Sequence, residues 1–344
     1  MLLAVSSGLL VACASGASGA EETVVPTTRP STTTSSTTTS STTTTSTSTT
    51  TTTTLPPVQV TGVFPDVVEA AKLGPLPDGL DINNSVIGKP VVYDDGCHAG
   101  VGAVVPAPCE YGMLTSDTVI VLVGDSHAAQ WFSAIDIAAW QNDWKVVTMT
   151  KSSCPAVDVS TYRRTDGDTG DQIPYPECDR FRHNSWETIR ELHPDLVIFP
   201  LLTRYKQING SGFGNWKTGL ATSISAIAQE GTKVLIIGEA PKTSGVDVPA
   251  CLRSHRNDIS ECANTRAEAE YPEKIFSILE VAIEHRATFV NPVDWVCDTE
   301  VCPVVIGGNV VYRDSNHLND AFVRYRAPQV AEAIRLALEG DDAI

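Results

Sequence analysis

The sequence has few basic residues for its length, and they are scattered along the chain. Its 344 residues include 24 Lys and Arg against 41 Asp and Glu, which gives a formal net charge of −17. Lys and Arg supply much of the affinity of proteins for nucleic acids, because they displace counterions from the phosphate backbone. No basic cluster offsets this acidic excess, so we expect no nucleic-acid partner.

Sequence patterns that bind metals are missing as well. The nine cysteines form no Cys-x-x-Cys repeat and have no histidine at the spacing that a zinc site requires. We therefore expect no metal and no cofactor. Apart from Cys13 the number of cysteines is even, which favours disulfides in an exported chain. Many connectivities are possible, and proximity along the chain suggests four pairs: Cys97 with Cys109, Cys154 with Cys178, Cys251 with Cys262, and Cys297 with Cys302.

The first 20 residues contain no charged residue, and their apolar composition indicates an export or membrane-anchor segment. They read MLLAVSSGLLVACASGASGA, without the positively charged start of an ordinary signal peptide. Three interpretations stay open. The start codon is misplaced, or the LVAC sequence is a lipoprotein signal that directs lipidation of Cys13, or the segment is the remnant of a last transmembrane helix.

The next part of the chain, residues 21–57, is a predicted disordered linker. From Pro26 to Pro57 it is almost wholly Thr and Ser with scattered Pro, and such a tract buries too little apolar surface to offset the entropy cost of ordering. Residues 58–116 are predicted to form an N-terminal extension that contains a disulfide. The main folded domain is predicted over residues 117–340.

Apolar runs and amphipathic segments alternate through this domain, which predicts an α/β fold with a parallel sheet and helices on both faces. In such sheets, ligands bind beyond the carboxyl ends of the strands. The predicted strands cover residues 118–123, 145–150, 195–200, 233–238 and 288–292, and the predicted helices cover residues 128–144, 178–192, 218–229, 266–285 and 320–338.

The sequence GDSH places Ser126 just after the first predicted strand, at the start of a helix. A serine there can act as a nucleophile whose oxyanion is stabilised by its own amide. The alternative is that Ser126 only caps the helix, which is a common use of serine.

Asp314 and His317 stand three residues apart in the loop before the last predicted helix. A serine hydroxyl is a weak nucleophile, so it needs a general base, and that base needs a carboxylate to orient it. The Asp-x-x-His pattern supplies both, which favours the nucleophile interpretation of Ser126. A solvated charged loop is the alternative.

Four stretches between about residues 96 and 337 carry a resemblance to the SGNH (GDSL-like) hydrolases. They are GDSHAAQW, TKSSCPAV, HPDLVIFP and VDWVCDTEVCPVVIGGNVVYRDSNHLN. The match is specifically with the extracytoplasmic SGNH domain of bacterial acyltransferase-3-type O-acyltransferases. The resemblance implies a three-layer α/β/α sandwich with a parallel, flavodoxin-like sheet. It also implies an acyl-enzyme mechanism, with Ser126 as nucleophile, His317 as base and Asp314 as the residue that orients it.

The sequence departs from the wider superfamily in its oxyanion hole. Typical members have a glycine after the second strand and an asparagine after the third, whereas this chain has KSSC and PLLTRY. The expected donors are therefore the amides of Ser126, Ser152, Ser153 and Thr203. The expected substrate contacts are Asp125, His127 and Arg204.

Three functions are compatible with these features. The first is a serine esterase or O-acyltransferase that acts on acyl groups, above all acetyl, of a cell-envelope glycan. A membrane acyltransferase domain or protein would deliver the acyl donor, and the domain would lie outside the cytoplasm, either anchored to the bacterial membrane or secreted. The second is a glycan-binding module that keeps the fold but has lost catalysis. The third, a metallophosphoesterase, would need a Gly-Asn-His segment that is not found in GFGNWKTG.

Overall fold

The computed structural model describes residues 64–80, 82, 88–165, 170–208 and 213–340. The predicted anchor segment (1–20), the predicted linker (21–57) and the expected lipidation site at Cys13 lie outside this range. Within it, no helix combines the length and the apolar character needed to cross a membrane.

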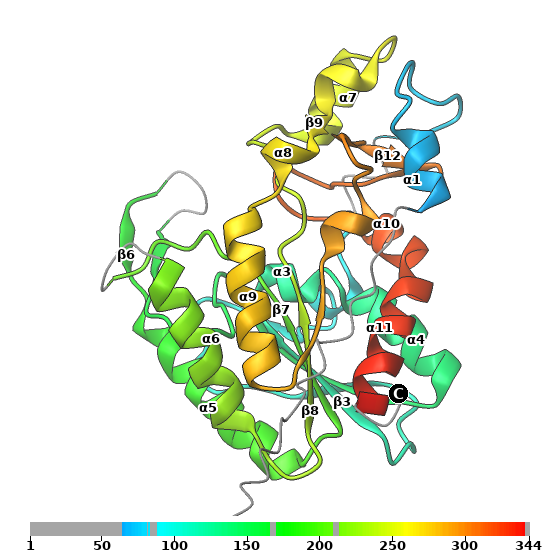
Figure 1. Cartoon of the computed structure of the whole chain (residues 1–344). Helices are drawn as coiled ribbons and strands as arrows, with labels where there is room; N and C mark the ends of the chain where they lie inside the picture. The colour runs from blue at the N-terminus through cyan, green and yellow to red at the C-terminus, as the bar shows by residue number, and fades with distance from the viewer. Residues whose placement is uncertain (1–63, 81, 83–87, 166–169, 209–212, 341–344) are drawn as a thin grey trace, which may run out of the picture. The chain divides into compact units, whose positions relative to one another are not determined.

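A seven-stranded sheet forms the centre of the fold (Figure 1). Its strands lie in the order β1-β4-β3-β7-β8-β10, all in parallel pairs, and β2 pairs antiparallel with β4. The five strands from β4 to β10 have the flavodoxin-like order 2-1-3-4-5, as predicted. The strands are β1 (His98–Ala99), β2 (Cys109–Gly112), β3 (Val119–Gly124), β4 (Lys145–Lys151), β7 (Leu196–Pro200), β8 (Lys233–Ile237) and β10 (Thr288–Val290).

Both faces of the sheet are covered by helices, which confirms the predicted three-layer α/β/α fold. Because successive strand residues point to opposite faces, Ile120 and Leu122 of β3 pack into one core cluster, and Val121 and Val123 pack into the other. The first cluster also contains residues of α3, α4, α10 and α11, and the second contains residues of α5, α6 and α9. Figure 1 shows α5, α6 and α9 together on one side of the sheet.

Three predicted helices are each divided in two. Prolines divide two of them, because proline has no amide hydrogen to donate and is tolerated only in the first turn. Pro272 begins α9, and Pro328 stands in the first turn of α11. The helix predicted over 128–144 is interrupted at Gln130 and Trp131, which separate α3 from α4. The helices are α1 (Pro65–Ala70), α3 (Ser126–Ala129), α4 (Phe132–Asn142), α5 (Pro176–Leu192), α6 (Phe213–Ile227), α7 (Val248–Ser254), α8 (Arg266–Ala269), α9 (Pro272–Glu284), α10 (Asp320–Tyr325) and α11 (Ala327–Glu339).

The boundary predicted at residue 117 does not separate two units. Strands β1 and β2 belong to the predicted extension, yet both pair with β4 in the main sheet. The segment before them also packs on the end of the chain. Asp66 forms an ion pair with Arg326, whose side chain is 2% exposed, and the Gly88 carbonyl accepts from the Asp320 amide. The described residues between 64 and 116 are therefore part of the same fold as the main domain.

Short connecting elements surround this core, and disulfides hold several of them. Four disulfides join the cysteines in the pairs that proximity along the chain suggests: Cys97–Cys109, Cys154–Cys178, Cys251–Cys262 and Cys297–Cys302. A short hairpin is formed by β12 (Val305–Ile306) and β13 (Asn309–Val310). The other small strand pairs are β5 (Tyr162–Arg164) with β6 (Gln172–Pro174) and β9 (Asn264–Thr265) with β11 (Val301–Cys302).

Candidate active site

Ser126 is the first residue of α3 and directly follows the tight turn after β3, at the carboxyl end of the sheet. Gly124 has a positive φ of 144°, and a Cβ at this position would come within 2.7 Å of the Ala128 Cβ, so glycine is required. Asp125, not Ser126, is the N-cap of α3: its Oδ1 accepts from the His127 amide at 2.7 Å and the Ala128 amide at 3.1 Å. The capping role therefore falls to the neighbour, and the half-buried Ser126 side chain is left for another contact.

That contact is with His317, which is 191 residues away in the sequence. The Nε2 of His317 lies 2.8 Å from the Ser126 Oγ, and its Nδ1 lies 2.9 Å from the Asp314 Oδ2. The other oxygen of Asp314 accepts from the Asn316 and His317 amides. Burial acts to raise the pKa of Asp314, but the hydrogen bonds from His317 and from these amides outweigh it and hold the pKa well below its usual range. Asp314 is therefore an anion beside the imidazole.

The loop that carries His317 is held by contacts from other segments. The Leu318 amide donates to the Oε1 of buried Gln130 at 2.8 Å, and the Tyr312 hydroxyl donates to the Pro241 carbonyl at 2.9 Å. The Thr243 hydroxyl donates to the Ser315 carbonyl. These ties fix the distance between the imidazole and Ser126. The sequence pattern did not reveal Gln130 or Thr243, because their partners are far along the chain.

Asp125 and His127 are both buried, contrary to the expectation that they contact substrate. Asp125 is 1% exposed, and its second oxygen accepts from the Tyr205 hydroxyl at 2.6 Å. Burial raises the pKa of Asp125, although these hydrogen bonds act against the shift. His127 is 5% exposed, and its ring stacks on that of His317 with 4.5 Å between centroids. Burial and the nearby His317 hold the pKa of His127 well below its ordinary value, so it is a neutral packing partner of the base.

Two of the expected oxyanion donors already make other hydrogen bonds. The Ser152 amide donates to the Ala99 carbonyl at 2.9 Å, because β1 extends the edge of the sheet beside it. The Thr203 amide donates to the Glu239 carboxylate at 3.1 Å. Ser153 differs, since it is exposed and has a left-handed φ of 55°, a conformation that favours glycine. The amides of Ser126 and Ser153 remain as candidates.

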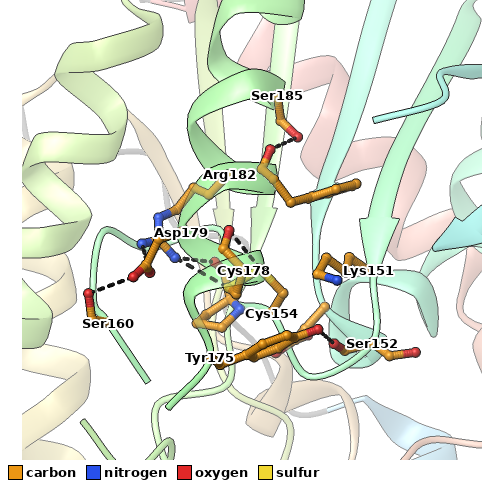
Figure 2. Close-up of a disulfide and its surroundings, with 12 residues drawn as sticks. Lys151, Ser152, Cys154, Ser160, Tyr175, Cys178, Asp179, Arg182 and Ser185 are labelled. Atoms are coloured by element: carbon orange, nitrogen blue, oxygen red, sulfur yellow. Dashed lines mark hydrogen bonds and ion pairs between the residues drawn. A yellow bond between two sulfur atoms is a disulfide. The ribbon is translucent and has the colours of Figure 1, made fainter. Parts of the chain in front are cut away.

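A disulfide and a buried lysine hold the loop after β4 (Figure 2). The Cys154–Cys178 disulfide joins this loop to α5, and the Tyr175 hydroxyl donates to the Ser152 carbonyl at 2.9 Å. The Lys151 ammonium donates to the carbonyls of Gly100 and Val101. Burial lowers the pKa of Lys151 to about 8. The loop that carries Ser153 is thus fixed on both sides.

His98 contacts this loop, although no sequence pattern assigned it a role. Its Nδ1 lies 2.9 Å from the Thr150 Oγ1, and its Nε2 lies 3.1 Å from the Ser152 Oγ. Burial, aided by the positive charge of Arg313, lowers the pKa of His98 to about 4. Its only sequence signal is a histidine beside a cysteine, which is too weak to suggest this position.

Arg204, the third expected substrate contact, lies on the opposite flank. Its guanidinium forms an ion pair with Glu239, which follows β8, and about a third of the side chain is exposed. Beside this pair a small cavity, whose empty volume of about 290 Å³ includes open solvent, lies between the ends of β7 and β8 and the start of α9.

One cluster in the described residues has potential metal ligands: Cys251, His255 and Cys262. The two cysteines are bonded to each other in a disulfide. They therefore offer no thiolates, which are the form of cysteine that binds metals.

Comparison with known proteins identifies what this chain resembles. A family model described as "SGNH domain (fused to AT3 domains)" matches residues 94–332, well over half of the chain. The periplasmic domain of a lipopolysaccharide acetyltransferase from Salmonella ser. Paratyphi A has a similar structure, with a TM-score of 0.52 and 15% identity over 75% of this chain and 98% of that chain.

Two further solved structures are more distant. A GDSL-like lipase from Bacteroides thetaiotaomicron has a TM-score of 0.34 and 16% identity over 64% of this chain and 88% of that one. A family two carbohydrate esterase from Clostridium thermocellum has a TM-score of 0.37 and 13% identity over 65% of each chain. No curated protein matches the chain.

Proposed function

The chain belongs to the family of SGNH domains that occur fused to AT3 domains, and from that premise we propose that it is a serine-dependent O-acyltransferase or esterase. Its substrate is an acyl group, above all acetyl, on a cell-envelope glycan. One observation carries the proposal: the Ser126 Oγ, the His317 ring and the Asp314 carboxylate are connected by contacts of 2.8 and 2.9 Å.

In this mechanism Ser126 forms the acyl-enzyme. His317 Nε2 takes the proton from the Ser126 Oγ as that oxygen bonds to the acyl carbon. The bond from the acyl carbon to the leaving oxygen then breaks, and His317 returns the proton to the departing alcohol. Asp314 holds the imidazole in the required tautomer and stabilises the imidazolium that forms between the two steps.

The second half of the reaction releases the acyl group. An incoming hydroxyl loses its proton to His317 and attacks the acyl-enzyme, and Ser126 recovers its proton when it leaves. Water as the incoming group gives an esterase, and a sugar hydroxyl gives a transferase. The negative oxygen of each tetrahedral intermediate is stabilised by the amides of Ser126 and Ser153. Each such donor contributes on the order of 10² to 10³ in rate.

The setting of this reaction is outside the cytoplasm. Four disulfides in the described residues favour an oxidising compartment. Because related SGNH domains are fused to AT3 domains, the acyl donor comes from a membrane acyltransferase domain or protein. The anchor is the N-terminal segment predicted from the sequence.

A fluorophosphonate probe tests the proposal directly, because it reacts with activated serines. We expect the purified full chain to be labelled at Ser126, as located by mass spectrometry of the digest. The Ser126→Ala variant is the control and should not be labelled. Folded wild-type protein without label would refute the enzyme and favour the non-catalytic glycan-binding module.

A further inference from the structure

The cavity next to the active site has a polar wall and an apolar floor. It opens at the carboxyl ends of β7 and β8, and β7 is the direct neighbour of β3, which carries Ser126. We call the apolar lining residues, which include Ala269 and Ile278, the floor, and the polar ones, which include Thr203, Glu239 and Lys274, the wall. The cavity thus has both the location and the mixed lining of a substrate-binding site.

Two sets of contacts connect this cavity to the proposed triad. On one side, Thr203 is followed two residues later by Tyr205, whose hydroxyl donates to Asp125 at 2.6 Å. On the other side, Glu239 begins the loop whose Pro241 carbonyl accepts from Tyr312, next to the loop that carries His317. A molecule in the cavity therefore lies beside the segments that position the nucleophile and the base.

The wall contains hydrogen-bond donors and acceptors in one small space. The Glu239 carboxylate accepts from the Thr203 hydroxyl and amide and from Arg204. The Lys274 ammonium donates to the Thr203 hydroxyl at 2.9 Å and lies 3.9 Å from the centroid of the Tyr271 ring. Burial lowers the pKa of Lys274.

The polar groups of the wall favour a sugar ring over an acyl chain as the occupant of the cavity. An acyl chain in the cavity would remove Glu239 and Lys274 from water and offer them no hydrogen bonds, which is unfavourable. A sugar ring offers hydroxyls that both donate and accept, and its C–H face matches the apolar floor.

We propose that this cavity is the acceptor subsite and binds one pyranose ring of the glycan. The C–H face of the ring lies on Ala269 and Ile278, its hydroxyls bond to Glu239 and Lys274, and an adjacent hydroxyl faces the acyl group on Ser126. The inference rests on the proposed function and adds the location and chemical class of the acceptor.

Competition between acceptors tests the subsite. The full chain is given p-nitrophenyl acetate together with glycerol and one methyl pyranoside, of glucose, galactose, mannose or N-acetylglucosamine. Glycerol has hydroxyls but no ring. Mass spectrometry then measures the ratio of acetylated sugar to acetylated glycerol. We expect at least one sugar to be preferred over glycerol by about tenfold or more, as charge-assisted hydrogen bonds to the ring would give.

Substitutions at Lys274 test whether the preference for sugar over glycerol arises in this cavity. Lys274→Met should lower the ratio of sugar to glycerol about tenfold, and Lys274→Arg, which keeps a cationic donor, should restore part of it. Lys217→Met is the matched control, because Lys217 pairs with Glu280 on the exposed surface of α6 and α9. It should leave the ratio unchanged.

A binding measurement makes the test independent of catalysis. Saturation-transfer NMR on Ser126→Ala should detect the preferred methyl pyranoside, and the signal should decrease when Lys274→Met is added. An equal preference for sugars and glycerol, or a sugar signal that is insensitive to Lys274, would overturn the subsite. So would faster turnover of p-nitrophenyl hexanoate than of the acetate, since that would place the acyl chain in the cavity. If the wild-type protein releases no p-nitrophenol from p-nitrophenyl acetate in a reaction that contains neither sugar nor glycerol, the proposed function itself is refuted.

Discussion

The nucleophile and its base are held in position by different means. Ser126 sits between a central buried strand and a helix, and its turn is fixed by backbone geometry and by the Asp125 cap. His317 sits on a loop that has no regular structure, fixed by side chains of other segments such as Gln130 and Thr243. The position of the nucleophile therefore depends on the stability of the fold, whereas the position of the base depends on a few separate hydrogen bonds.

Removing the side chain of Ser126 or of His317 should cause the largest loss of activity, and the two losses should be equal. Without His317 the Ser126 hydroxyl stays protonated at neutral pH, so Ser126→Ala and His317→Ala should each reduce p-nitrophenyl acetate turnover by about 10⁴-fold or more. The double variant should lose little more, because members of a triad act as a unit. Losses that multiply in the double variant would show that the two residues act independently and would refute the triad.

Asp314→Asn should have a smaller effect, about 10² to 10⁴-fold. It keeps the base but removes the negative charge that stabilises the imidazolium. The measurement is kcat for the same ester, with circular dichroism to verify the fold. Activity equal to wild type would mean that His317 needs no orienting carboxylate, and the loop would then be only a charged surface.

Sequence reasoning located these three residues because each signal is local. Gly-Asp-Ser follows an apolar strand, and Asp314 stands three residues before His317, so both patterns can be read within a few positions. The parallel sheet was predictable for the same reason, since alternating strands and helices indicate one, whereas the flavodoxin-like strand order was implied by the resemblance to SGNH hydrolases. The ties of the base loop were not predictable: Gln130 and Leu318 are 188 positions apart, and nothing in either segment indicates the other.

Two of the three expected substrate contacts, Asp125 and His127, are buried for a related reason. Proximity of Asp125 and His127 to Ser126 in sequence suggested exposure, but a residue that caps a helix and one that packs under it point into the protein. Whether a backbone amide can serve as an oxyanion donor depends on whether it already donates to another group, and the sequence does not show this. The partners of the Ser152 and Thr203 amides became clear only when Ala99 and Glu239 were placed.

Asp125→Ala tests how the turn that carries Ser126 depends on the stability of the fold. It removes the cap of α3 and leaves the buried Tyr205 hydroxyl without its acceptor, so we expect a loss of about 3 kcal/mol in the free energy of unfolding. Asp125→Asn should lose less, because its carbonyl oxygen can still cap the helix. Urea denaturation measures both. A stable Asp125→Ala protein would mean that the cap does not hold this turn.

Gln130→Leu should test the base side, with the opposite outcome. The substitution keeps a similar volume but removes the acceptor for the Leu318 amide, so the loop that carries His317 loosens. We expect kcat to decrease about tenfold, as a small displacement of a catalytic group would cause. Stability should change by less than for Asp125→Ala. A stability loss as large as that of Asp125→Ala with normal kcat would erase the difference between the two regions.

The smallest expected effect is on the pH dependence of stability, and it reports on the nucleophile side through His98. Burial lowers the pKa of His98 to about 4 in the folded protein, while the unfolded chain has a value of about 6.5. Between these values the unfolded state binds the proton and the folded state does not. The stability from His98 is therefore fully present above about pH 6.5 and is lost as the pH falls towards 4, at about 1 kcal/mol per pH unit.

His98→Gln should flatten this slope, because glutamine does not titrate and can still bond to Thr150 or Ser152. The lowered pKa of His127 adds a slope in the same direction, and the raised pKa of Asp125 adds one in the opposite direction, so the change from wild type to His98→Gln is what isolates His98. The lowered pKa of Asp314 acts at more acid pH, since its contribution is lost only below the ordinary value of about 4. Urea denaturation from pH 7 to pH 4 measures the difference. An unchanged slope in His98→Gln would mean that His98 titrates normally and is not buried beside the Ser152 loop, and the nucleophile side would then be less rigid than the comparison requires.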